Sequence, residues 1–440
     1  MRKYIITIVL LIMGLATFAQ TKAWNLKTCI EFGLTHSSTI KKQQAQVEIY
    51  KQNYKEAVGG LFPSLKASSD GTTYFGRVLD KDNYKYVNTN TVYNEYQIYS
   101  SVTLFDGFSQ VAKVRMERMN KQKGLQQLQL RKDMLAYEIM ELFFNVQYYQ
   151  GTVKLADDQL WESFANLKKV QKMEELGLKS KPDIAEIEAK ASQDSFLLVK
   201  QQNLLQQEII KLKNKINFPV DSDIIIKQYD SVILVGKPTE NAFDIYKQAL
   251  SYSPQIKASE QTVKVSEQAV NEARGNLFPT LSLYGGYNTY FTRLMNGSSY
   301  TPFRDQLNNN QNYYVGLSLS VPIFTGFSRQ SAVQRNKQQL VIAKYEFDDT
   351  RRTLYSDIEQ TVADVKGKAE EYIYAQKQCR SMQTAHEANL KKYEMGMISA
   401  LELNTSANRL LQAQVDELNT SLQYQLKSRM LNYYKGNSFY

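Results

Sequence analysis

The chain has 440 residues, 43% of them hydrophobic, and a formal net charge of +10. No block of five or six basic residues stands out, so we expect Lys and Arg spread over solvated helix faces and no nucleic-acid partner. The only cysteines are Cys29 and Cys379, and the only histidines are His36 and His386, none at metal-ligand spacing. No phosphate-binding loop or nucleophile elbow occurs, and we expect no cofactor, no metal and no enzyme activity.

The first residues resemble a secretory leader. A basic Met1-Arg2-Lys3 precedes an apolar run and a small-residue cleavage site that ends at Ala19. We therefore expect residues 1–19 to be a signal peptide that is cleaved near Ala19. No later run approaches the length of about 20 apolar residues that a spanning helix needs. If the mature chain enters a membrane, we expect it to do so through β-strands.

The rest of the chain repeats one pattern twice. Leu61-Phe62-Pro63-Ser64-Leu65 recurs as Leu277-Phe278-Pro279-Thr280-Leu281, an offset of 216 residues (278 − 62). Phe105-Asp106-Gly107-Phe108-Ser109 recurs as Phe324-Thr325-Gly326-Phe327-Ser328, an offset of 219 (324 − 105). Such self-similarity predicts a duplicated architecture. We place a first repeat at 20–217, a linker with short strands at 218–239, and a second repeat at 240–440.

Each repeat is expected to run through a helix, a β-hairpin, a long helix and a return helix. In the first long helix, apolar residues step by three and four from Ile139 to Val170 with Ser163 as the only polar interruption, which is typical of coiled-coil packing. At 1.5 Å per residue, such a helix is on the order of 100 Å long. The predicted elements are helices at 26–58 and 242–274, hairpins at 63–106 and 279–325, long helices at 107–176 and 326–395, and return helices at 180–217 and 399–434.

The hairpin segments alternate between apolar and polar residues with a period of two. Leu65 and Ala67 alternate with Ser64 and Lys66, and the other strands follow the same rule. This pattern suits a strand between lipid and a watery lumen, although a half-buried strand in a soluble sandwich would show it too. Four strands cannot close a barrel, whereas three chains would supply twelve. We expect the strand tyrosines to form girdles at the membrane interface, and plain polar loops at 79–92 and 294–312.

The turns between long and return helices carry capping signals in both repeats. A glycine closes the long helix, a serine follows three residues later, and an acidic residue stands three residues after the serine. This spacing predicts a left-handed glycine cap and then a capping box. The residues concerned are Gly177, Ser180, Asp183, Gly396, Ser399 and Glu402.

These motifs resemble those of the TolC-like outer membrane efflux proteins. The likeness rests on the duplicated Leu-Phe-Pro-x-Leu, the Phe-x-Gly-Phe-Ser before each long helix, and the Gly-x-x-Ser-x-x-Asp/Glu turns, and it covers 23–434. The resemblance implies a mainly α fold with a transmembrane β part. Three chains would share a twelve-stranded barrel in the outer membrane of a Gram-negative bacterium and a helical barrel across the periplasm.

The same resemblance implies partners and candidate site residues. The partners would be a periplasmic adaptor and an inner-membrane transporter, in a tripartite efflux or type I secretion system. Asp183 and Glu402 match acidic positions at the tunnel entrance, and Tyr393 matches a gate tyrosine. Ile398 and Thr405 depart from the family pattern, where a basic gate residue and a second acid would stand. The resemblance also makes Pro63, Gly107, Pro279 and Gly326 the junctions between hairpins and helices.

Two other classes remain open from the residues alone. A periplasmic coiled-coil adaptor that never enters the bilayer would explain the long helices but not the two hairpins. A solute-selective porin would explain the hairpins but not the long helices. For Asp183 and Glu402, helix capping alone is the alternative to a role at the entrance.

Overall fold

The computed structural model describes residues 23–79, 84–177, 179–228, 235–236, 239–295 and 301–440. The expected signal peptide and its cleavage site at Ala19 lie outside these residues, as does most of the expected strand at 232–235. The described chain divides into two compact units. The first unit holds Met1–Gln44, Gln127–Pro254 and Arg351–Tyr440, and the second holds Ala45–Gln126 and Gln255–Thr350.

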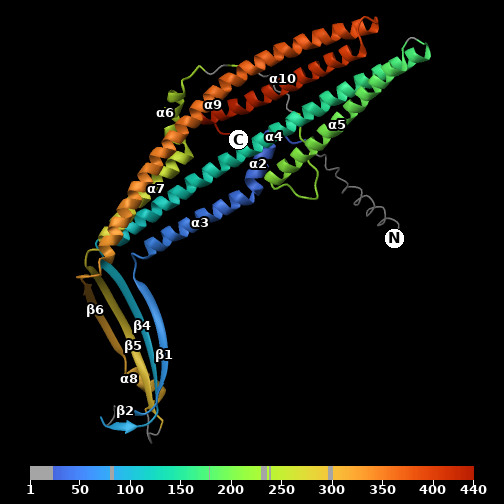
Figure 1. Cartoon of the computed structure of the whole chain (residues 1–440). Helices are drawn as coiled ribbons and strands as arrows, with labels where there is room; N and C mark the ends of the chain where they lie inside the picture. Colours follow the sequence, from blue (N-terminus) through green and yellow to red (C-terminus); the bar gives the residue numbers. More distant parts are fainter. Residues whose placement is uncertain (1–22, 80–83, 178, 229–234, 237–238, 296–300) are drawn as a thin grey trace, which may run out of the picture. The chain divides into compact units, whose positions relative to one another are not determined.

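The helices come in pairs of equal length, as the predicted internal duplication requires (Figure 1). Short helices of 11 residues are followed by helices of 22, then by long helices of 67 and return helices of 35. The first repeat contains α2 (Leu26–His36), α3 (Ser38–Gly59), α4 (Ser109–Glu175) and α5 (Lys181–Lys215). The second repeat contains α6 (Ala242–Tyr252), α7 (Pro254–Gly275), α9 (Ser328–Glu394) and α10 (Ala400–Tyr434).

The opening helix of each repeat is broken, although the sequence predicted one continuous helix. At Ser37 the backbone is extended, with ψ of 124°, and the Ser37 hydroxyl accepts a hydrogen bond from the Thr39 N–H at 3.2 Å. Ser253 has the same conformation, with ψ of 120°, directly before Pro254. A proline has no N–H to donate and disfavours a helical residue before it, so it begins a helix well and ends the preceding one.

The core of the first unit lies where α2, α4 and α5 meet. Ile30, Ile139, Phe143 and Leu212 are fully buried there. Gly33 of α2 permits the close approach, because an added Cβ would lie 2.4 Å from the Ile139 Cδ1. Of the expected linker strands, Ile226 forms only an isolated parallel bridge with Trp24.

The second unit contains a four-stranded antiparallel sheet in the order β1-β4-β5-β6 (Figure 1). The four strands match the predicted hairpins. They are β1 (Ser64–Tyr74), β4 (Thr91–Phe105), β5 (Thr280–Leu294) and β6 (Asn312–Ser320).

The two expected polar loops contain structure that the sequence did not predict. The first holds a hairpin of β2 (Arg77–Leu79) and β3 (Tyr86–Asn88), and the second holds the short helix α8 (Phe303–Asn309). Strands of three residues and a helix of seven are too short to show a periodic pattern.

Candidate functional site

The turn between α4 and α5 is held by a complete capping box. Gly177 has φ of 73°, the left-handed conformation of a helix C-cap. The Asp183 N–H donates to the Ser180 hydroxyl at 3.4 Å, and the Ser180 N–H donates to the Asp183 carboxylate at 3.1 Å. The Ser180 hydroxyl also donates to that carboxylate at 2.8 Å. These bonds from Ser180 hold the pKa of the Asp183 carboxyl below its ordinary value.

The turn between α9 and α10 repeats this arrangement. Gly396 also has φ of 73°, and Ser399 and Glu402 exchange two hydrogen bonds of 3.2 Å. The two expected departures from the family pattern lie nearby. Ile398 packs against the apolar core of the turn region, and the Thr405 hydroxyl donates to the Leu401 carbonyl at 2.8 Å. Both acidic residues therefore act as capping residues, whatever else they do.

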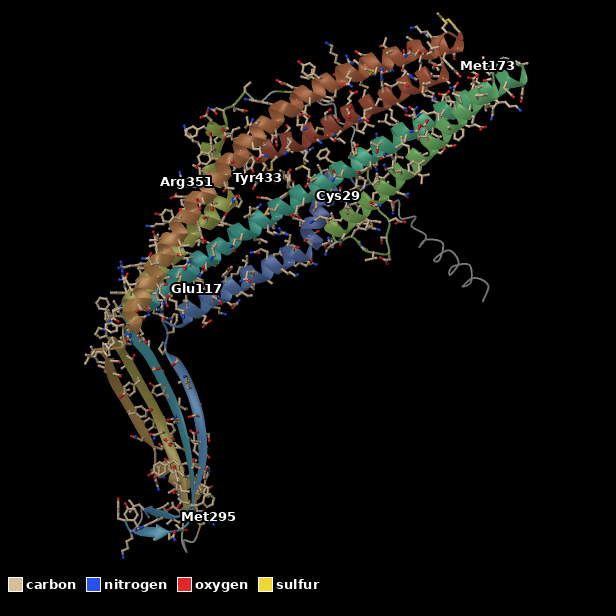
Figure 2. The ribbon with its side chains drawn as sticks, viewed as in Figure 1. Cys29, Glu117, Met173, Met295, Arg351 and Tyr433 are labelled. Carbon is tan, nitrogen blue, oxygen red and sulfur yellow. The ribbon has the colours of Figure 1, made fainter. Side chains whose placement is uncertain are left out.

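Tyr393 lies inside the core below these turns. Its side chain is 6% exposed and packs in one cluster with Val170, Ile187, Ala400 and Leu403. Figure 2 labels Met173 of α4 near this end of the helices. Tyr393 is therefore a packing residue of the turn region in this single chain.

Two polar features of Tyr393 set it apart from its apolar neighbours. The Lys179 ammonium lies 5.0 Å from the centre of its ring, which is a cation–π contact. The Tyr393 hydroxyl is buried without a hydrogen-bond partner among the described residues. Burial raises the pKa of this hydroxyl, and the nearby charges of Asp183 and Glu186 raise it further.

An ion pair and a histidine–carboxylate contact join α4 to α9 in this region. Lys169 lies 3.0 Å from Glu394, and both side chains are about half exposed. His386 is buried, and its Nε2 lies 2.9 Å from the Glu162 carboxylate. His386 and Cys379 are both buried. The contact of His386 with Glu162 was not predicted.

A buried polar cluster joins α4, α5 and α10, and sequence reasoning missed it. The Lys190 ammonium donates to the Asp194 carboxylate at 2.6 Å and to the Asn408 side-chain oxygen at 2.8 Å. The Ser163 hydroxyl donates to the same carboxylate at 2.5 Å. Lys190 is 6% exposed and Asp194 is 2% exposed. Two features of the sequence could have indicated this cluster. Lys190 and Asp194 are four residues apart, and Ser163 interrupts the apolar seam.

The junctions between sheet and long helices are strained in the same way in both repeats. Gly107 has φ of 66° and Gly326 has φ of 59°, and the phenylalanine after each, Phe108 or Phe327, also has positive φ. The phenylalanine conformation is disfavoured, since its Cβ crowds the backbone. It turns each ring edge-on to the phenylalanine three residues earlier, with centroids 5.7 Å apart in both repeats. Pro63 and Pro279 stand directly before β1 and β5, where a strand tolerates proline.

The strand register sorts the sheet residues onto two faces, because directly opposite residues share a face. We call one the apolar face, and many of its large side chains are exposed. They include Leu65 at 75%, Val315 at 84% and Leu317 at 65%. The other, the polar face, carries Ser, Thr, Asn, Gln and Glu side chains together with several tyrosines. Its members on the two central strands are Tyr93, Glu95, Gln97, Tyr99, Ser101, Ser282, Tyr284, Gly286, Asn288, Tyr290 and Thr292.

The strand tyrosines that were expected to form a girdle divide between the two faces of the sheet. Tyr96, Tyr287 and Tyr313 lie on the apolar face, as an interfacial girdle requires. The tyrosines of the polar face instead point away from the side that suits lipid. The alternation of Tyr99 with Ile98 already placed Tyr99 on the polar side.

Metal sites and membrane-spanning helices are both absent among the described residues. No group of three or more His, Cys, Asp or Glu side chains among them is placed to hold a metal ion. No helix in the described part of the chain is both long and apolar enough to cross a membrane.

The fold is similar to that of several solved outer membrane proteins. CusC matches with a TM-score of 0.80 at 16% identity, covering 96% of both chains. VceC from Vibrio cholerae matches with a TM-score of 0.77 at 14% identity, over 94% of this chain and 97% of that one. MtrE from Neisseria gonorrhoeae, solved in an open state, matches with a TM-score of 0.74 at 17% identity, over 94% and 89%.

Part of the sequence also matches a known protein family. Residues 245–437, nearly all of the second repeat, match the outer membrane efflux protein family. This match covers the second repeat only, where the chain is similar to outer membrane efflux proteins. No curated protein matches the sequence significantly. The family match and the fold together confirm the TolC-like resemblance that the duplicated motifs predicted.

The matched family and the structural relatives are outer membrane efflux proteins and channels, and both agree with the predicted efflux channel. The family is one of transport channels and not of enzymes. The structural relatives are outer membrane channels of Gram-negative bacteria. The mainly helical fold with four long strands in one open sheet agrees with the predicted fold class.

Proposed function

We propose that three copies of this chain form one passive export duct through the outer membrane. The observation that carries this proposal is the open sheet. Its outer strands β1 and β6 each pair on one side only within the described residues. Lipid does not tolerate an unpaired strand edge, because its N–H and C=O groups would have no partner. Three sheets joined edge to edge would close a barrel of twelve strands.

The different polarity of the two faces supports the proposal that the sheet forms a wall between lipid and water. On the apolar face, Val315, Leu317 and Leu319 are each more than half exposed in the single chain. Exposed apolar area of this kind marks a surface that is covered in the working protein. The polar face would then line the lumen, as in other transmembrane barrels.

The long helices support a duct that continues beyond the membrane. Each of α4 and α9 has 67 residues, about 100 Å of helix. We propose that these helices cross the periplasm and that the turns at Gly177 and Gly396 meet a periplasmic adaptor and an inner-membrane transporter. The energy for export would come from that transporter, and the duct would need no cofactor and catalyse nothing. The cargo would be small molecules or, in a type I secretion system, polypeptides.

The location follows from the same proposal. The mature protein would reach the outer membrane of a Gram-negative bacterium after removal of a signal peptide near Ala19. The acidic residues Asp183 and Glu402 would stand at the entrance, and Tyr393 would belong to the gate region.

A periplasmic scaffold that never enters the bilayer is the alternative. It would leave the apolar face of the sheet in water, which the exposure of Val315 and Leu317 disfavours. Cell fractionation and detergent extraction distinguish the two functions. A duct is recovered from the outer membrane, resists carbonate extraction and migrates as a heat-sensitive trimer. A soluble monomer in the periplasmic fraction would contradict the proposal.

A further inference from the structure

Five tyrosines of the polar face form close ring pairs across the strands. Tyr93 stacks on Tyr290 with centroids 5.6 Å apart and an angle of 28° between the ring planes. Tyr99 stacks on Tyr284 at 6.4 Å and 27°, and Tyr284 lies 6.3 Å from Tyr314. These pairs extend over β4, β5 and β6 and make a row of rings on one face of the sheet.

Two glycines on this face make room for the rings. An added Cβ on Gly286 would lie 2.6 Å from the Tyr314 hydroxyl oxygen. An added Cβ on Gly316 would lie 2.6 Å from the Tyr284 ring. The rings of Tyr284 and Tyr314 therefore lie over the glycine backbone of the neighbouring strand. The Tyr284 and Tyr314 side chains are both partly exposed.

Two carboxylates stand beside the first ring pair. The register places Asp70 of β1 directly opposite Glu95 of β4, and Glu95 directly opposite Tyr290 of β5. The Tyr93 hydroxyl donates to the Glu95 carboxylate at 3.4 Å. Like charges directly opposite each other destabilise a strand pair, so a cation between them would lower the energy of this arrangement. The basic Lys66 of the same face lies four residues from Asp70, about 13 Å along the strand.

We propose that Tyr93 and Tyr290, with Asp70 and Glu95, form a binding site for planar organic cations inside the duct. This inference rests on the proposed function, because it needs the polar face to line the lumen. A flat aromatic cation would stack on these rings, and its positive charge would interact with the electron-rich ring faces and the two carboxylates. The site would give the passage a preference among small cargo molecules.

The experiment measures block of single channels in planar bilayers by ethidium, a planar aromatic cation, and by tetrabutylammonium, an aliphatic one. The changed protein carries Tyr93→Leu with Tyr290→Leu. We expect the ethidium concentration for half-block to rise about tenfold, which corresponds to about 1.4 kcal/mol of binding free energy. Tetrabutylammonium block should weaken less, because this cation interacts with the rings through its charge but cannot stack on them. Tyr93→Phe with Tyr290→Phe keeps the rings and should retain ethidium block.

The matched control is the tyrosine pair of the apolar face. Tyr287 of β5 and Tyr313 of β6 lie 5.0 Å apart and face the other way. Tyr287→Leu with Tyr313→Leu should leave ethidium block unchanged. An equal loss in both leucine variants would overturn the proposal, since the effect would then come from the sheet and not from the polar face.

A second variant keeps the test decisive if the leucine protein does not assemble. Glu95→Gln preserves size and should weaken block by both cations several-fold. Conducting Glu95→Gln channels that ethidium blocks at the unchanged concentration would overturn the proposal. If the unchanged protein forms no channel at all, it is the proposed duct function that fails, and the two failures are thereby distinguished.

Discussion

The Lys190 ammonium lies 2.6 Å from the Asp194 carboxylate, one turn further along α5, and both side chains are almost completely buried. Asn408 of α10 and Ser163 of α4 complete the cluster, so three helices contribute to it. A buried ion pair of this kind adds little net stability compared with an apolar pair, but removal of one partner leaves a charge without compensation.

We therefore predict that Lys190→Ala destabilises the first unit by about 3–5 kcal/mol, since the Asp194 carboxylate would remain buried and unpaired. Thermal loss of helical circular dichroism in the detergent-solubilised protein measures this. The matched control is Lys264→Ala, which breaks an exposed pair with Glu260 at 2.7 Å and should cost less than about 1 kcal/mol. Equal melting of the two variants would contradict the prediction.

Gly107 and Gly326 occupy equivalent positions in the two repeats, but we predict that replacement by alanine has unequal effects at the two positions. Both have positive φ, so alanine at either position carries backbone strain of about 1–2 kcal/mol. At Gly107 an added Cβ would also lie 2.3 Å from the Gly275 carbonyl oxygen, whereas at Gly326 it meets nothing within 4 Å. Gly107→Ala should therefore reduce the yield of assembled protein more than Gly326→Ala. Outer-membrane fractions of the two variants measure the yield, and equal yields would count against the clash.

We predict that the stability of the folded protein depends on pH through Asp133 of α4. Burial raises the pKa of its carboxyl, although hydrogen bonds from Gln129 at 2.7 Å and from the Tyr433 hydroxyl at 3.0 Å act in the lowering direction. A raised folded-state pKa means that the folded protein binds the proton more tightly than the unfolded chain. The contribution of Asp133 to stability is then largest below the ordinary pKa of about 3.9 and falls as the pH rises through the folded value.

Asp133→Asn should remove this contribution, so the difference in melting temperature between the variant and the unchanged protein should depend on pH just above 4. Tyr433→Phe deletes one bond that lowers the pKa, and it should move the dependence to higher pH. Melting differences that stay constant from pH 3 to pH 8 would contradict the assignment.

The capping carboxylates Asp183 and Glu402 predict a cation effect at the proposed entrance. Asp183→Asn with Glu402→Gln should weaken block of the channel by multivalent cations without unfolding the protein, because the amide oxygens can still accept the capping bonds from Ser180 and Ser399. Since the pKa of Asp183 is lowered, its charge should persist as the pH falls below about 3.9. Single-channel recordings measure the block. Ser180→Ala with Ser399→Ala weakens both caps but keeps the charges, and it should retain the block.

The sequence predicted the features that depend on local periodicity. The duplicated Phe-Pro and Phe-x-Gly-Phe motifs, the apolar seam from Ile139 to Val170, and the alternation around Leu65 all correspond to elements of the structure. The capping boxes at Ser180 and Ser399 were also predicted, because a capping box depends only on a spacing of three residues.

The sequence did not reveal contacts that depend on how separate helices and strands pack. The bond between Lys190 and Asn408 joins residues 218 positions apart, and that between His386 and Glu162 joins residues 224 apart. Neither pair has a local signal. The rings of Tyr284 and Tyr314 lie over glycines of neighbouring strands, which requires the register and not only the alternation.

The short helix α8 has a consequence for the outer end of β5. Beyond Asn288, β5 has no partner in β6, and the Gln306 side chain of α8 binds both the N–H and the C=O of Thr292 at 2.9 Å. The Asn310 side chain binds the Tyr290 carbonyl at 2.9 Å. The two amide side chains thus form hydrogen bonds of the kind that a neighbouring strand would form. At Tyr290 and Thr292 these side chains occupy backbone groups that a foreign strand could otherwise pair with, which protects this part of the edge from aggregation.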